Sequence, residues 1–274
     1  MIAHASGGLA LPAVACITVG LSAPLIGTFL VQKRLSLIGD GVGHVAFAGV
    51  GAGLLLGVWP VWTALAFAVA GATGVEVLRS RKRASGDLAL ALFFYAGLAL
   101  GAVFASRAGN VELESLPYLF GEPEQITTAG VVAVVLAAVA VVGGTWVLHR
   151  ALFAVVTDED WARAQGLPVD LLNIGLAAVT ATIIVAGMRI VGLLLTAALM
   201  VLPVATAQLI ARSFRTTLWL ALALGGASAV VGLGLGRWFD VTVGGAIVLV
   251  AAAVFAVTAI AKGAAPRALR QEEH

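Results

Sequence analysis

An aspartate and a histidine stand four residues apart inside an apolar stretch of this 274-residue chain. On an α-helix that spacing puts Asp40 and His44 on one face. A carboxylate oxygen together with an imidazole nitrogen suits a borderline divalent cation such as zinc, manganese or ferrous iron. Because Gly39, Gly41 and Gly43 alternate with them, we expect open space around both side chains. The pair predicts a metal-handling site, and the alternative is a simple Asp–His hydrogen bond inside a helical bundle.

Two ligands do not complete a metal site, so a second copy of the chain enters the argument. If two copies met on a two-fold axis, the pair would become two aspartates and two histidines, which is a four-ligand set. A charged side chain at the bilayer centre costs roughly 2.5 to 3.5 kcal/mol on insertion scales, and persists mainly beside a cavity or a partner. Glu76 is the other acidic residue of the predicted spans, and we expect it to pair with Arg79 at the membrane interface.

The composition is that of a helical membrane protein. Apolar residues make up 61% of the chain and charged residues 11%, and the mean hydropathy is +1.07. Soluble domains carry about a quarter charged residues. These values exclude a soluble enzyme, a disordered protein and a disulfide-rich secreted domain, and the lone Cys16 forms no disulfide framework. The net charge of +2 gives no reason to expect a nucleic-acid partner.

Apolar stretches of the length that a membrane helix needs, about 20 residues, recur along the chain. They are residues 9–32, 35–58, 60–78, 88–106, 126–148, 171–188, 190–211, 216–236 and 241–261. Of the 16 basic residues, 13 fall in one set of alternate loops, which by the positive-inside rule faces the cytoplasm. We therefore predict an all-α polytopic transmembrane bundle of about nine spans, forming a single domain over residues 1–274. Its N-terminus would lie outside and its C-terminus in the cytoplasm. The first stretch is the least constrained, since no basic residue precedes it.

Two loops are long enough to carry structure of their own. Residues 107–125, on the predicted outer side, include the apolar segment 116–121, which we expect to form a short helix over the outer mouth. On the cytoplasmic side, residues 149–170 are expected to hold a short amphipathic helix that Thr157 caps and Gly166 ends. The chain contains neither a phosphate loop of the form G-x-x-x-x-G-K-[ST] nor an H-E-x-x-H motif.

Five segments in order resemble the membrane permeases of ATP-binding-cassette importers for zinc and manganese, and most closely the zinc-uptake permeases. They are IGDGVGHVAFAGVGAGLLLG, PYLFGEP, VTDEDWARAQGLPVDLLN, RIVGLLLTAALMVLPVATAQLIARS and WFDVTVGGAIVLVAA. The likeness covers almost the whole chain. It departs from the family at Val243-Gly244-Gly245, where relatives have prolines, at Gln208, where many have arginine, and at Val45, where many have alanine.

The resemblance implies a transport subunit rather than an enzyme. Two copies of this chain would form the pathway in the cell membrane, cytoplasmic ATPase subunits would bind and hydrolyse the ATP, and an extracytoplasmic metal-binding protein would deliver the ion. Asp40 and His44 match the family's metal ligands along the pathway. The cargo would be zinc first, with manganese or ferrous iron also compatible, and no covalently bound cofactor is implied.

The resemblance also assigns two peripheral segments. Residues 157–167 would be the coupling helix that docks on the ATPase, and residues 113–122 would form an outer gate. The coupling residues are expected to be Asp158, Glu159, Ala162 and Gly166. The gate and kink residues are expected to be Tyr118, Phe120, Gly121 and Pro203.

The function that we expect is ATP-driven import of a divalent metal by alternating access. Two rivals stay open at this point. One is a metal channel or secondary carrier that needs no ATPase. The other is an importer of the same architecture for a metal chelate, whose pathway would be wide and poor in ligands, so that Asp40 and His44 would be incidental. A structural membrane scaffold would explain neither the Asp–His pair nor the short cytoplasmic helix.

Overall fold

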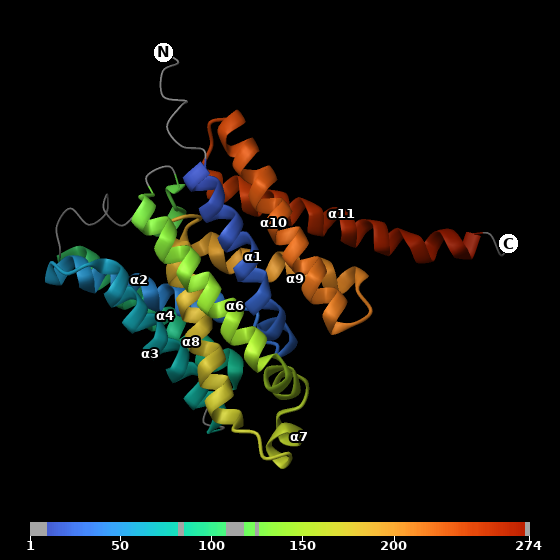
Figure 1. The fold of residues 1–274 in the computed structure, drawn as a ribbon, viewed down its shortest axis with the longest axis horizontal. Coiled ribbons are helices and arrows are strands. Elements are labelled where there is room, and N and C mark those ends of the chain that lie inside the picture. The colour runs from blue at the N-terminus through green and yellow to red at the C-terminus, as the bar shows by residue number, and fades with distance from the viewer. Residues whose placement is uncertain (1–9, 82–84, 108–117, 124–125, 272–274) are drawn as a thin grey trace.

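The fold of this chain is a bundle of α-helices, and the predicted fold class is confirmed (Figure 1). The structure, a computed structural model, describes residues 10–81, 85–107, 118–123 and 126–271, apart from the side chains of Ala105, Leu194 and residues 263–271. The helices are α1 (Ala10–Gln32), α2 (Ile38–Leu56), α3 (Pro60–Ser80), α4 (Gly86–Arg107), α6 (Thr128–Thr157), α7 (Glu159–Ala164), α8 (Val169–Met188), α9 (Leu193–Ile210), α10 (Phe214–Trp238) and α11 (Val243–Gln271). These described residues contain no β-strand.

Each predicted apolar stretch coincides with one long helix. Eight helices of the described chain are long and apolar enough to cross a membrane. The remaining stretch, residues 190–211, is α9, an apolar helix of 18 residues that contains Pro203. The first stretch, whose span was least certain from sequence, forms the continuous helix α1 over Ala10–Gln32. The chain is therefore a multi-pass membrane protein.

The helices divide into two packed groups that share α8 and α9. In one group α2 packs between α3 and α4, and in the other α1 packs against α6, α9 and α10, with α11 beside α9 and α10. Figure 1 shows α2, α3 and α4 on one side of the bundle, while α11 runs out beyond the other helices toward the C-terminus. One hydrophobic core connects the two groups, with Phe29, Ile183 and Leu199 among its fully buried side chains.

Glycines set the closeness of several of these helix contacts, as small residues do in membrane bundles. A Cβ atom added to Gly97 of α4 would stand 2.6 Å from the backbone nitrogen of Val45 and 2.7 Å from the carbonyl carbon of His44 in α2. A Cβ added to Gly27 of α1 would overlap the carbonyl oxygen of Met200 in α9. These positions accept no larger residue unless a helix moves.

Gly97→Ala is expected to destabilise the fold by about 1 to 3 kcal/mol, since the new methyl group meets backbone rather than a side chain that can turn away. Gly143→Ala in α6 is the matched control, because no atom lies within 4 Å of a Cβ added there. Thermal unfolding in detergent should show a lower midpoint for Gly97→Ala alone. An unchanged midpoint would contradict this contact between α2 and α4.

Candidate functional site

The Asp–His pair lies at the beginning of α2. Asp40 stands in the first turn of α2 and His44 one turn later, so the two share a helix face as the spacing predicts. The helix starts after Leu37 without a side-chain cap. Both side chains are half-buried. A carboxylate and an imidazole thus stand together near one end of a membrane helix.

The ring of His44 packs against α4 but leaves one nitrogen without a partner. Its centroid lies 4.4 Å from that of Phe94, in an edge-to-face arrangement. Within the described residues, the buried Nδ1 of His44 has no hydrogen-bond partner. No hydrogen bond there joins it to Asp40, which the simpler alternative for this pair would require. A buried polar atom without a partner is costly and needs an explanation, and a transient metal ligand supplies one.

The glycines around the pair do not have the role that the sequence analysis expected. A Cβ on Gly39 would lie 3.0 Å from the Cβ of Ala197, and one on Gly43 would lie 3.1 Å from a methyl group of Leu193. Both neighbours belong to α9. These two glycines therefore bring α9 close to α2 instead of leaving space around the ionisable side chains.

One copy of the chain supplies an incomplete set of metal donors. No group of three or more His, Cys, Asp or Glu side chains that could hold an ion occurs in the described part of the chain. Asp40 and His44 together give two donor groups, whereas a tetrahedral zinc site takes four ligands. Such a pair holds an ion weakly unless further ligands come from a second copy, and weak binding suits an ion that must move on.

The short helix predicted between the fifth and sixth apolar stretches is present as α7. Its cap is Asp158, whose Oδ1 accepts a hydrogen bond of 2.9 Å from the backbone nitrogen of Trp161. Thr157, the predicted cap, is instead the last residue of α6, and its hydroxyl donates to the carbonyl of Phe153. The apolar helix α6 runs through residues 149–157, which were predicted to lie in a loop, and it ends at Thr157. Gly166 follows α7 with φ of +79°, a left-handed conformation that favours glycine.

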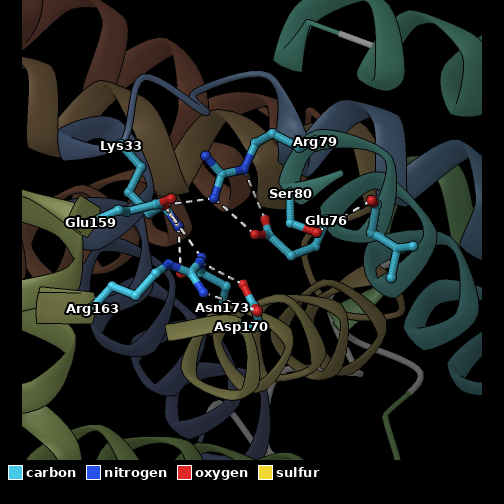
Figure 2. A network of polar contacts seen from close by, with 9 residues as sticks. Lys33, Glu76, Arg79, Ser80, Glu159, Arg163, Asp170 and Asn173 are labelled. Atoms are coloured by element: carbon cyan, nitrogen blue, oxygen red, sulfur yellow. Dashed lines mark hydrogen bonds and ion pairs between the residues drawn. The ribbon is translucent and has the colours of Figure 1, made fainter. Parts of the chain in front are cut away.

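The two faces of α7 have different surroundings. Asp158, Trp161 and Gly166 are exposed, and 56% of the surface of Trp161 is accessible. Ala162 is fully buried, and the carboxylate of Glu159 turns toward the other helices (Figure 2). Of the four predicted coupling residues, Ala162 is therefore buried and Glu159 directs its carboxylate into the bundle, whereas Asp158 and Gly166 are exposed. Helical geometry turns positions three apart onto one face, and here that face is the packed one.

The predicted ion pair between Glu76 and Arg79 is confirmed. The guanidinium of Arg79 donates to both carboxylate oxygens of Glu76, at 2.8 and 3.1 Å, and Glu76 is 3% exposed. The same guanidinium also donates to Glu159, at 2.6 Å. Glu76 is thus paired inside the bundle and is not available to a metal.

Lys33 is a participant in this cluster that the sequence analysis did not identify. Its Nζ lies 2.8 Å from Oε1 of Glu159 and donates to Oδ1 of Asn173 at 2.6 Å (Figure 2). Burial lowers the pKa of Lys33, although the hydrogen bond to Glu159 opposes that shift. Burial would raise the pKa of Glu159, but the hydrogen bonds from Lys33 and Arg79 outweigh it and lower that pKa. Charge was the one feature of the sequence that could have indicated this cluster, because Lys33, Arg79 and Glu159 all fall in the same set of alternate loops.

The predicted gate segment precedes the first residue of α6 and α7 follows its last residue, so the two lie at opposite ends of that helix. Residues 113–117 fall outside the described residues, and the segment is seen from Tyr118 onward. Tyr118 is buried, with the guanidinium of Arg189 over its ring at 5.4 Å, whereas Phe120 is half exposed. Gly121 has φ of +75°, and a Cβ there would stand 2.4 Å from the backbone nitrogen of Gly192.

The segment Val243-Gly244-Gly245, where relatives have prolines, packs against the gate segment. A Cβ on Gly244 would lie 2.1 Å from the carbonyl oxygen of Val191 and 3.1 Å from that of Phe120. The first turn of α11 therefore packs backbone against backbone with the gate segment and with the turn between α8 and α9. Beside this contact is a cavity of about 460 Å³ whose wall includes Glu122 and Asp240.

Comparisons with known proteins agree with this arrangement. The model of a family described as the ABC 3 transport family matches residues 9–262. The chain is 28% identical over 242 residues to the manganese transport system membrane protein MntC of Listeria innocua, covering 88% of this chain and 86% of that protein. It is 26% identical over 238 residues to the high-affinity zinc uptake system membrane protein ZnuB of Haemophilus influenzae, covering 87% and 91%.

A solved structure shares the fold. It is that of PsaBC from Streptococcus pneumoniae in complex with a Fab, and the matched chain is 27% identical to this one. The TM-score is 0.81, with 90% of this chain and 89% of that chain covered.

Proposed function

Because this chain belongs to the ABC 3 transport family, whose members are permease subunits of ABC transporters, we propose that it carries a divalent metal ion into the cytoplasm. The Asp40–His44 pair would be the point on the pathway that the ion touches. The observation that carries this proposal is the buried Nδ1 of His44, which lacks a partner in the described chain while a carboxylate stands one turn away.

Zinc is the first cargo that we propose, and manganese is its principal competitor. The relatives include a protein named for manganese at 28% identity and one named for zinc at 26% identity. A carboxylate with an imidazole is compatible with both ions, since metal selectivity depends on geometry and on availability. Ferrous iron fits the same donor set.

The assembly that we propose has two copies of this chain, ATPase subunits on the cytoplasmic side and an extracytoplasmic metal-binding protein. A two-fold pairing would bring a second Asp40 and a second His44 to the pathway and so complete the ligand set. The exposed face of α7 would dock on the ATPase. The contact of Gly121 with the α8–α9 turn would belong to the outer gate, and Pro203 in α9 removes one backbone donor beside the pathway.

Metal-competition uptake tests the proposal. Vesicles that contain the chain with its ATPase, with the metal-binding protein outside, should take up radioactive zinc when ATP is supplied inside. Unlabelled zinc, manganese or ferrous iron should compete in the order of their affinity. Uptake by the purified chain alone in liposomes, without ATP, would instead identify a channel or secondary carrier. Competition only by a metal chelate would favour the chelate importer.

A further inference from the structure

The carboxylate of Glu159 joins α7 to three other parts of the molecule. Its Oε1 accepts hydrogen bonds from Arg79 of α3 at 2.6 Å and from the side-chain amide of Asn173 of α8 at 3.3 Å, and it pairs with Lys33 at 2.8 Å. Figure 2 shows these side chains converging on one oxygen. A movement of α7 therefore acts on all three elements through a single atom.

One of these contacts leads directly to the helix that carries the metal pair. Lys33 lies in the turn between α1 and α2, where the backbone nitrogen of Leu35 donates to Leu30 and that of Ile38 donates to Leu35. Leu35 and Ile38 are buried, at 5% and 2% exposure. This turn is short, hydrogen-bonded and packed, so we expect a displacement of Lys33 to be passed to the start of α2, where Asp40 stands.

The cluster is balanced in charge. Lys33 and Arg79 are offset by Glu76 and Glu159, and the side chains of Lys33 and Glu76 are each 4% exposed. Removing the charge of Glu159 leaves the buried Lys33 ammonium without a counter-ion, whereas removing both charges together does not, because Arg79 and Glu76 stay paired. This difference allows stability and coupling to be separated.

We propose that Glu159 is a positioning residue that transmits the movement of α7 to Asp40 and His44, and that it does so as a rigid ionic link inside the permease and not as a contact for the ATPase. The inference rests on the proposed function, because it takes α7 as the docking element and the Asp–His pair as the metal site.

The test compares Glu159→Gln, Lys33→Met and the double variant K33M/E159Q, each reconstituted in liposomes with the ATPase subunit and supplied with the metal-binding protein. Two quantities are measured: zinc ions moved per ATP hydrolysed, and the midpoint of thermal unfolding of the complex. Each single variant should lower the number of ions per ATP, and Glu159→Gln should also lower the midpoint because it strands the charge of Lys33. The double variant should recover the midpoint, because no buried charge is left unpaired, yet its ions per ATP should stay about fivefold or more below wild type, the lower end of usual coupling between sites.

The matched control is the other ion pair of α7, between Arg163 and Asp170 of α8, at 2.8 Å with both side chains more than half exposed. The variant R163M/D170N removes an equal pair of charges from the same helix but does not touch the turn before α2. It should keep the wild-type number of ions per ATP.

Recovery of ions per ATP together with the midpoint in K33M/E159Q would overturn the inference, because Glu159 would then only support the fold. An equal loss of ions per ATP in R163M/D170N would also overturn it, since any weakening of α7 would suffice. Absence of zinc, manganese and ferrous iron uptake by the wild-type complex would instead overturn the proposed function, and the inference with it.

Discussion

Asp40→Asn and His44→Ala are each expected to abolish metal uptake while leaving the subunit assembled with its ATPase. Asparagine keeps the shape of aspartate but loses the negative charge, and alanine removes the imidazole entirely. Loss of a group that merely supports a metal ligand typically costs roughly 10- to 100-fold in affinity or activity. Loss of a ligand from a pathway site should cost more, so residual uptake should fall below detection.

The measurement is initial uptake of zinc or manganese in vesicles, with co-purification of the ATPase as the check on assembly. Asp87→Asn is the control for the carboxylate, because Asp87 also stands in the first turn of a membrane helix but is exposed. His149→Ala is the control for the imidazole, since His149 is exposed on α6. Uptake at the wild-type rate by either site variant would contradict the assignment of the pair.

Trp161→Ala is expected to weaken association with the ATPase by at least about 2 kcal/mol, which is the usual threshold for a dominant interface residue. Trp161 is the large apolar side chain on the open face of α7, and 56% of its surface is accessible. Covering this exposed tryptophan with a partner would remove a large apolar surface from water, which favours association.

The matched control is Trp62→Ala in α3, because Trp62 is 70% exposed but lies at the other end of its helix from Arg79. Affinity of the detergent-solubilised subunit for the ATPase should fall for Trp161→Ala and not for Trp62→Ala. Equal affinity for both variants would show that this face of α7 is not the docking surface. Gly166→Trp should weaken docking as well, since its φ of +79° suits glycine and the site is exposed.

Most of the helical architecture could be predicted because it follows from local composition. An apolar run of about 20 residues has to satisfy its backbone hydrogen bonds within itself in a membrane, so it forms a helix wherever it occurs. The errors were at helix ends. Thr157 was predicted to cap α7, but it belongs to α6, and Asp158 is the cap. Two adjacent polar residues offer equivalent caps in the sequence, and packing of the preceding helix selects one of them.

In the candidate site, too, some features follow from residues close together in the sequence and others from packing between distant helices. The spacing of Asp40 and His44 on one helix face is a property of the sequence, and so is the pairing of Glu76 with Arg79, which lie within one turn of each other. The sequence does not determine that Nδ1 of His44 lacks a partner among the described residues, nor that Glu159 points into the bundle. Both depend on segments that are distant in the sequence, since Lys33 and Glu159 come into contact only when the turn after α1 meets α7.

The amino-acid sequence thus determined by itself the number and order of the apolar helices, the Asp–His pair and the likeness to a family of permeases, because each depends on residues close together in the chain or on their order along it. Only the tertiary structure decided what Gly39 and Gly43 pack against, which face of α7 is open, and where the charge of Glu159 goes. These features arise between helices, whose mutual rotation and approach are set by packing over the whole bundle and leave no periodic trace in any one segment.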